Sequence, residues 1–552
     1  MKKILLCAIH SKFIHSSPAV YYLKTAAEYF APGNAEHIDI CEGSINDTDD
    51  HLLYNILSSK PDILGFSVYI WNVEKVTRLC RSVKSVYPEI KIILGGPEVS
   101  CGIDHTSLTE KDYDYIISGE GERAFTAAIF ICSGEDVPEN IEYTLKDKVI
   151  SSPQIEHLDE IPFVYNEKNI GNFDNRIVYY ESSRGCPFSC AYCLSSICGK
   201  VRFLSLERVY SDLDFFIDHN IEQVKFVDRT FNCQKNRAVK IWEYILKRSG
   251  DSRTNFHFEI GADLLDENAL NVLKKMPAGK VQLEIGIQST NEAALRESCR
   301  YAPNSKIFSS TARLVSGGNI NVHTDLIAGL PYEDYESFQN SFNEVYALYS
   351  HQLQLGFLKL LSGAPLNKIK EKHGYVFSSF PPYEVLKNKY ISFEELQKLK
   401  EIEDALEKFY NSGRFVLSLK KIEKHFETPF GRYEFFAEKM KEKNLLFRSC
   451  SSKNLYDFLS GFFPEYSADL LEDFYLSENS QIVPQSLKNL VPLNKYLQPA
   501  SNRFLKANGF SKDKKVLAKF INSEALAIDY SEKNPVTGRY RILMRKEVSF
   551  DE

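Results

Sequence analysis

Residues 184–193, RGCPFSCAYC, are the most informative stretch of this sequence. Within them Cys186, Cys190 and Cys193 follow the spacing CxxxCxxC. Thiolates are the usual protein ligands of iron–sulfur clusters. Three thiolates on one short loop can bind three irons of a [4Fe–4S] cluster and leave the fourth iron open, much as catalytic zinc sites keep one position open. The motif therefore predicts a cluster with room for a substrate or cofactor at one iron.

Two other kinds of site fit the same loop. A zinc site would take a fourth ligand, for which Cys198 or His219 is available. An electron-transfer cluster closed by four cysteines would also use Cys198. We interpret Cys198 as a thiol outside the cluster. Eight of the 12 cysteines are scattered, and in a chain of 552 residues with no secretion signal we expect no disulfide framework.

The sequence after this loop alternates strand and helix patterns. Strands are predicted at 177–182, 223–227, 255–260, 281–287, 321–327 and 353–358. Six such units favour a partial (β/α)6 barrel over a second open sheet, and chemistry in barrels takes place at the carboxyl ends of the strands. The polar residues expected at those ends are Cys186, Asp228, Glu259, Gln288, Asp325 and Lys359.

The first part of the chain predicts a doubly wound parallel sheet. Near-continuous apolar strands, such as 62–68 and 90–94, alternate with amphipathic helices. In such folds ligands bind beyond the carboxyl ends of the strands. Glycine-rich turns at 95–97 and 119–122 follow two of these strands, where the backbone can approach a ligand closely or simply turn tightly.

These patterns divide the α/β chain into three domains. We predict a doubly wound domain over 1–135, a linker with a small hairpin over 136–175, and a barrel over 176–365. The remaining residues, 366–552, are predicted to be mainly helical, with a hairpin around 534–538 near their end.

Composition excludes several classes of protein. Hydrophobic residues make up 43% and charged residues 26%, as in an ordinary globular protein. The net charge of -7 provides no global basic field for nucleic acid. No run of 18 apolar residues exists, and the short run 4–9 predicts a buried strand rather than a signal peptide. We therefore expect a cytoplasmic protein with no membrane partner.

The cysteine motif, with an aromatic residue before its last cysteine, resembles the radical S-adenosylmethionine (SAM) superfamily. In that family the open iron binds the amino and carboxylate groups of SAM, and one electron from the cluster cleaves SAM to a 5′-deoxyadenosyl radical. The resemblance implies that Cys186, Cys190 and Cys193 are the catalytic residues and the ligands of the [4Fe–4S] cluster.

Later strand ends are similar to the branch of the superfamily that includes oxygen-independent coproporphyrinogen oxidase. The matching segments are FEI at 258–260, EIGIQS at 284–289 and DLIAGLP at 325–331. Carboxylates and amides suit ribose hydroxyls and an ammonium, and an arginine suits a carboxylate. Val227-Asp228-Arg229 stands where the family usually has Gly-Gly-Glu. By this resemblance SAM contacts Tyr192, Asp228, Glu259, Gln288, Arg300 and Asp325.

The order of the first two domains resembles the cobalamin (B12)-binding class of radical SAM proteins. The matching segments are PDILGFS at 61–67, GGPE at 95–98 and GEGE at 119–122. By this resemblance cobalamin contacts Ser67, Gly95, Gly96, Glu120 and Gly121. The Asp-x-His-x-x-Gly motif of methionine synthase is absent, so no histidine ligand to cobalt is implied. Segments at 358–363, 382–386 and 411–415 resemble the subgroup with a carboxyl-terminal domain of unknown function 4080.

This class resemblance implies a cobalamin-dependent radical SAM methyltransferase that acts on an unactivated carbon. A second hypothesis keeps the radical step but replaces methyl transfer with ring closure, oxidation or sulfur-group modification, including modification of RNA. A third is a non-catalytic cobalamin or Fe–S sensor. The sequence pI of about 6.0 favours a small-molecule substrate over RNA. The class also implies an electron donor such as flavodoxin or ferredoxin.

The three-ligand interpretation makes a direct prediction. Anaerobic reconstitution should give about four irons per chain. Cys186→Ala, Cys190→Ala and Cys193→Ala should each abolish SAM cleavage, measured as 5′-deoxyadenosine released after reduction. Cys198→Ala is the matched control and should retain both the irons and the cleavage. A Cys198→Ala protein without a cluster would refute the three-ligand interpretation.

Overall fold

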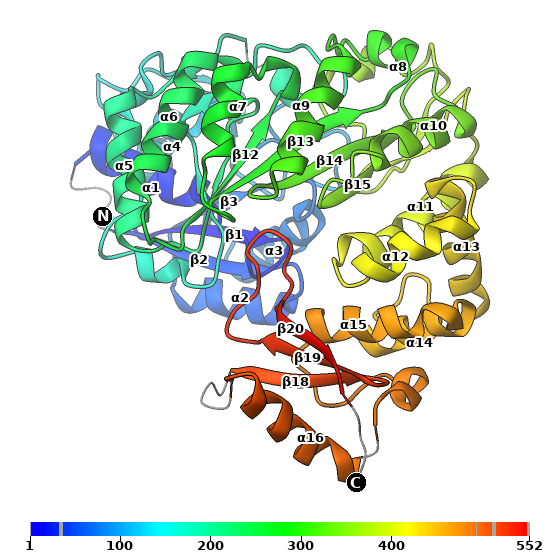
Figure 1. The fold of residues 1–552 in the computed structure, drawn as a ribbon. Helices are drawn as coiled ribbons and strands as arrows, with labels where there is room; N and C mark the ends of the chain where they lie inside the picture. Colours follow the sequence, from blue (N-terminus) through cyan, green and yellow to red (C-terminus); the bar gives the residue numbers. More distant parts are fainter. Residues whose placement is uncertain (1, 33–36, 198, 493, 511–514, 549–552) are drawn as a thin grey trace. The chain divides into compact units, whose positions relative to one another are not determined.

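The computed structural model describes residues 2–32, 37–197, 199–492, 494–510 and 515–548 (Figure 1). The chain forms two compact units. The first comprises Met1–Val272, Leu295–Tyr301 and Phe357–Lys389, and the second comprises Leu273–Ala294, Ala302–Gly356 and Tyr390–Glu552.

The first unit contains the predicted doubly wound domain. Its sheet has seven strands in the order β2-β1-β3-β4-β5-β7-β6. The parallel strands are β1 (Ile4–His10), β2 (Ile38–Ser44), β3 (Ile63–Ser67), β4 (Lys91–Gly95) and β5 (Tyr115–Ser118). All seven residues of β1 are buried, as expected for a central strand covered on both faces.

Four helices supply that cover. They are α1 (Pro18–Phe30), α2 (Asp49–Ser58), α3 (Val73–Val86) and α4 (Gly121–Ser133). Leu52 of α2 and Val76 of α3 belong to one apolar core, and Ala26 of α1 and Ala127 of α4 belong to another. The glycine-rich turns at 95–97 and 119–122 lie at the carboxyl ends of β4 and β5.

The hairpin predicted between 136 and 175 is present as β6 (Thr144–Lys146) and β7 (Val149–Ser151). It has a role that the sequence did not show, because β7 pairs in parallel with β5 and extends the first sheet. Ile150 in β7 has no exposed surface. Strands of three residues are too short for an alternating apolar pattern to reveal a sheet partner.

The first three barrel strands also belong to the first unit. They are β8 (Val178–Tyr180), β11 (Gln223–Phe226) and β12 (Asn255–Ile260), and β11 pairs in parallel with the other two. Between them run α5 (Leu206–Asp218) and α6 (Lys235–Arg248). The space between strands and helices is filled by fully buried aromatic side chains, including Tyr180, Phe216, Phe226, Trp242 and Phe258.

The series of strands continues in the second unit with β13 (Val281–Gln288) and β14 (Asn321–Ala328), which are parallel. Burial alternates along both strands, so one face packs against a core and the other carries polar residues. The helices α7 (Glu267–Lys274), α8 (Glu292–Glu297), α9 (Asn304–Gly317) and α10 (Tyr335–Tyr346), and the strand β15 (Gln352–Phe357), complete the six predicted strand-and-helix units.

The last part of the second unit is mainly helical, as predicted. Its helices are α11 (Phe393–Leu406), α12 (Val416–Ile422), α13 (Pro429–Glu442), α14 (Ser452–Phe462), α15 (Ser467–Ser477) and α16 (Asn494–Ala507). The predicted hairpin is formed by β19 (Glu524–Asp529) and β20 (Arg541–Glu547), and β18 (Val516–Ile521) adds a third antiparallel strand on which α16 packs (Figure 1).

A buried ion pair joins the hairpin to the helices of this unit. Arg539 donates to the fully buried carboxylate of Asp473 at 2.7 Å, and the same carboxylate accepts hydrogen bonds from the start of α12. Within the described ranges, no helix combines the length and apolar character needed to cross a membrane.

Candidate functional site

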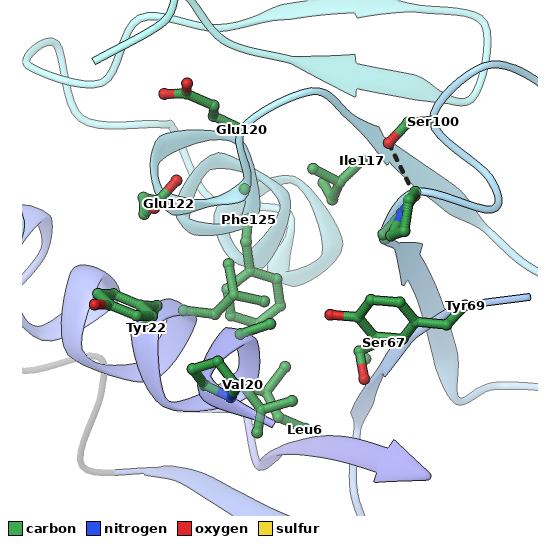
Figure 2. A pocket seen from close by; sticks show the side chains of 18 of the residues that line it. Leu6, Val20, Tyr22, Ser67, Tyr69, Ser100, Ile117, Glu120, Glu122 and Phe125 are labelled. Atoms are coloured by element: carbon green, nitrogen blue, oxygen red, sulfur yellow. Dashed lines mark hydrogen bonds between the residues drawn. The ribbon is translucent and has the colours of Figure 1, made fainter. Parts of the chain in front are cut away.

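A cavity of about 460 Å³ lies at the carboxyl ends of β3, β4 and β5 in the first unit (Figure 2). Its walls carry Ser67 at the end of β3, Tyr69 just after it, Ile117 of β5, Tyr22 of α1 and Phe125 of α4. A largely apolar cavity with a few placed polar groups at this edge of a doubly wound sheet has the character of a ligand site.

All five residues predicted to contact cobalamin line this cavity: Ser67, Gly95, Gly96, Glu120 and Gly121. Barrel residues also line it, namely Tyr179, Glu181, Arg184, Val227 and Arg229. The cavity therefore joins the sheet edge to the ends of β8 and β11. Sequence reasoning missed the aromatic residues Tyr22, Tyr69 and Phe125, since a single aromatic residue in a helix or turn has no distinguishing pattern.

The glycines at the cavity edge have different physical roles. Gly96 has φ +117°, and a Cβ there would lie 2.5 Å from the carbonyl oxygen of Val68, so the backbone itself requires glycine. A Cβ at Gly95 would lie 3.5 Å from the Cβ of Ile117, an ordinary contact. A larger side chain at Gly95 would thus fill part of the cavity without straining the chain.

Glu120 is held within the cavity wall. Its carboxylate pairs with Arg202, lies 3.3 Å from Arg184 and accepts a hydrogen bond from the Ile155 N–H at 3.0 Å. Burial alone would raise the pKa of Glu120, but the hydrogen bonds from Arg202 and the charge of Arg184 outweigh it and hold this pKa below its usual value. Glu120 is therefore an ionised structural anchor.

Arg184 is the centre of this polar wall. It donates to Glu181 through Nε at 3.0 Å and through Nη2 at 2.7 Å, and to Glu122 through Nη2 at 2.7 Å. The strand β9 (Ser183–Arg184) pairs with β10 (Arg202–Phe203), so Arg184 lies directly opposite Arg202. One ionic network therefore joins the loop before α4 to the chain that enters the cysteine motif.

The loop that carries Cys186, Cys190 and Cys193 begins directly after Arg184. Cys190 is buried, and Cys186 and Cys193 are half-buried. The Ala191 N–H donates to the Ser298 carbonyl at 2.9 Å, and the Leu366 N–H donates to the Ala191 carbonyl at 2.8 Å. Two distant segments of the first unit thus fix the backbone between the second and third cysteines.

The environment of the three thiols suits a metal cluster. Burial raises the pKa of Cys186, and the nearby Cys193 and Cys190 raise it further. The Phe188 N–H and Thr230 lie against Cys186, and Arg300 Nη1 lies 3.9 Å from Cys190 Sγ. Hydrogen bonds to sulfur are among the means by which proteins tune iron–sulfur clusters.

The predicted SAM residues fall into two groups. In the first unit, the half-buried Tyr192 lies within the cysteine loop, and Arg300 Nη1 lies beside the sulfur of Cys190. Glu259 of β12 pairs with Lys225 at 3.7 Å. In the second unit, Gln288 and Asp325 lie near the carboxyl ends of β13 and β14.

Gln288 is the most distinctive of these residues. It has φ +74°, beside the irregularity in the β13–β14 pairing. Its Oε1 is buried without a hydrogen-bond partner among the described residues. A strained backbone and an unsatisfied buried acceptor at one strand end are features of functional sites.

Asp228 has a different setting from the other predicted SAM residues. It is 1% exposed, and its carboxylate accepts hydrogen bonds from the Ser182 N–H at 2.8 Å, Ser182 Oγ at 2.7 Å and Ser183 Oγ at 2.5 Å. Burial raises its pKa to about 6, although these three donors oppose the shift. In this structure Asp228 secures the segment that leads into the cysteine motif.

The zinc alternative gains no support from the described residues. The imidazole of His219 at the end of α5 bonds the Phe215 carbonyl at 2.8 Å and Glu167 at 3.1 Å. Cys198 lies outside the described residues. Within the described part of the chain, no group of three or more His, Cys, Asp or Glu side chains is arranged to hold a single metal ion.

Three family models match the chain. They are the B12 binding domain over residues 6–129, the radical SAM superfamily over 180–345, and the protein of unknown function DUF4080 over 371–548.

Individual proteins match with low identity. The cobalamin-dependent radical SAM methyltransferase TokK of Streptomyces tokunonensis is 23% identical over 58% of this chain and 50% of its own length. The chain thus spans about half the length of the curated relatives it matches. The solved structure of the cobalamin-dependent SAM radical enzyme OxsB has a TM-score of 0.57 at 14% identity and covers 93% of this chain and 76% of its own. That of the radical SAM methyltransferase TsrM from Kitasatospora setae has a TM-score of 0.55 at 15% identity, over 70% of this chain and 80% of its own.

The Arg184 network predicts the effect of a single substitution. Arg184→Met should leave the buried carboxylate of Glu122 and the half-buried carboxylate of Glu181 without their cation, at a cost of about 3–5 kcal/mol. Hydrogen exchange should then accelerate in both 119–123 and 184–193, measured on peptides from these segments. Arg123→Met is the control, because Arg123 pairs with Glu160 instead, at 2.9 Å. Unchanged protection of both segments in Arg184→Met would contradict the network's role.

Proposed function

Because the chain is a radical SAM protein with a B12-binding domain and a domain of unknown function 4080, we propose that it is a cobalamin-dependent radical SAM methyltransferase. The observation that carries the proposal is the shared cavity. Its lining combines every predicted cobalamin residue with barrel residues that include Arg184, two residues before Cys186.

The residues present fit the implied cofactors. Cys186, Cys190 and Cys193 would hold the [4Fe–4S] cluster. Arg300, beside Cys190, can bind the SAM carboxylate with two parallel hydrogen bonds. When bound, the cluster supplies one electron for the cleavage of SAM, and cobalamin carries the methyl group.

The cavity supports the cobalamin part of the proposal. Its apolar walls suit a corrin, and the glycine-rich strand ends let the backbone approach a nucleotide tail. No histidine stands among the described residues that line it. Three histidines of the first domain have other partners: His10 at the end of β1 bonds Glu42 at 3.0 Å, His15 bonds Tyr179 at 2.7 Å, and His105 pairs with Glu98 at 3.2 Å.

The chain's own residues position the cysteine loop. Asp228 and the Arg184 network hold residues 182–184, which lead into the motif, and Ser298 and Leu366 bind the backbone of Ala191 within it. Reacting groups that the protein holds in the correct orientation react faster, because the entropy of orienting them is lost before the reaction begins.

The proposal extends to substrate, partner and location. We assign an unactivated carbon of a small molecule as the methyl acceptor, and a flavodoxin or ferredoxin as the electron donor. We place the protein in the cytoplasm. All eleven cysteines that the structure describes are free thiols, a state that suits a reducing compartment.

Cobalamin uptake tests the cavity. The purified protein should bind cobalamin, and electron paramagnetic resonance of its Co(II) form should show no nitrogen superhyperfine splitting. Gly95→Val should reduce uptake while leaving the iron content unchanged, because its Cβ enters the cavity without a backbone clash. Gly171→Val is the control, since a Cβ there meets nothing within 4 Å. Nitrogen splitting would reveal a histidine ligand on cobalt and contradict the prediction. Gly96→Val is not used to block the cavity, because any side chain at Gly96 strains the backbone.

Product analysis tests the reaction itself. The reduced, cobalamin-loaded protein should convert SAM into both 5′-deoxyadenosine and S-adenosylhomocysteine, separated by chromatography and identified by mass spectrometry. Cys190→Ser should produce no 5′-deoxyadenosine. Deoxyadenosine without S-adenosylhomocysteine would favour ring closure, oxidation or sulfur-group modification over methyl transfer. Absence of both products would favour a non-catalytic sensor.

A further inference from the structure

The charged residues of the cavity wall are paired, with one exception. Glu120, Glu122 and Glu181 are bound by Arg184 and Arg202, as described above. The remaining charged residue that lines the cavity is Arg229, whose side chain is exposed. Among the described residues, no carboxylate lies within ion-pair distance of its guanidinium.

Arg229 stands at the barrel side of the cavity, just beyond β11. Its neighbour in the chain, Asp228, is unavailable as a partner, because Ser182 and Ser183 occupy that carboxylate. Burial raises the pKa of Tyr69, and the positive charge of Arg229 opposes that shift, so the two side chains are close enough to interact. Arg229 therefore presents an uncompensated positive charge to a largely apolar space.

We propose that Arg229 binds an anionic group of the substrate, a carboxylate or a phosphate, in this cavity. The inference rests on the proposed function, because it takes the cavity as the place where substrate and cofactors meet. A guanidinium offers a planar pair of donors that matches carboxylate and phosphate oxygens. Once cofactors cover the cavity, the positive charge of Arg229 would be removed from water, which is costly without a counter-charge. An anionic substrate would supply that counter-charge.

Two anionic groups of the cofactors could bind Arg229 in place of the substrate. The SAM carboxylate has its own candidate partner in Arg300, beside Cys190. The phosphate of the cobalamin tail is expected along the glycine-rich loops after β4 and β5, whereas Arg229 follows β11 of the barrel. The position of Arg229 therefore favours binding of a substrate anion over either cofactor anion.

The protein carries a natural reporter for this site. Trp71 stacks on Tyr69, with ring centroids 4.3 Å apart and planes at 6°. The chain has 2 tryptophans, and the other, Trp242, has no exposed surface. An anion that binds beside Tyr69 should change the emission of Trp71.

The experiment titrates the protein with succinate and, separately, with inorganic phosphate at constant ionic strength. Binding is followed by tryptophan fluorescence and by calorimetry, and neutral succinamide serves as the uncharged probe. We expect saturable binding of at least one anion and none of succinamide. Arg229→Gln should weaken that binding about tenfold or more, and Arg229→Lys should weaken it less, because a charge-assisted hydrogen bond is retained. Arg253→Gln, which removes an exposed arginine before β12, should bind the anion as the wild type does.

Separate measurements of SAM and cobalamin affinity distinguish the sources of the anion. Both affinities should be unchanged in Arg229→Gln. A weaker affinity for SAM would assign Arg229 to the SAM carboxylate, and a weaker affinity for cobalamin would assign it to the tail phosphate; either result overturns the proposal. Absence of anion binding by the wild type in both fluorescence and calorimetry overturns it as well. A wild-type protein that binds anions but takes up no cobalamin would instead refute the proposed function.

Discussion

The ionic network around Arg184 is the interaction on which the candidate site depends. Arg184 and Arg202 lie opposite each other in a two-stranded ladder, and together they bind Glu120, Glu122 and Glu181. The carboxylate of Glu122 is buried, and a buried carboxylate without its cation is costly, so the network resists partial opening. Because Arg184 is two residues from Cys186, the loop before α4 and the cysteine motif have one common anchor.

Other contacts make that anchor effective. Asp228 fixes Ser182 and Ser183 on the barrel side, while Ser298 and Leu366 bind the backbone of Ala191 inside the motif. The backbone is therefore fixed both just before the first cysteine and between the second and third cysteines. A reaction that needs two cofactors and a substrate in register benefits from such rigidity, since groups that are slightly misplaced react much more slowly.

The sequence predicted the order of strands and helices well, because hydrophobic period and glycine-rich turns are local signals. The strand predicted at 255–260 is β12, residue for residue, and all five predicted cobalamin residues line one cavity. The local sequence pattern did not predict which way individual side chains point or which groups they contact. Asp228 stands near a strand end as expected, yet its carboxylate is enclosed, because its neighbours Ser182 and Ser183 are far away in the sequence. Arg184 escaped notice for the same reason, since its partners lie on other segments.

The position of cobalt in crystals of the cobalamin-loaded protein would show whether the cavity of the first unit holds the corrin. Anomalous diffraction at the cobalt edge locates the metal without assuming where the corrin lies. We expect a cobalt peak in the cavity bounded by Tyr69, Gly95 and Phe125, with no histidine nitrogen within bonding distance. A cobalt peak elsewhere on the protein, or one coordinated by a histidine, would contradict that expectation.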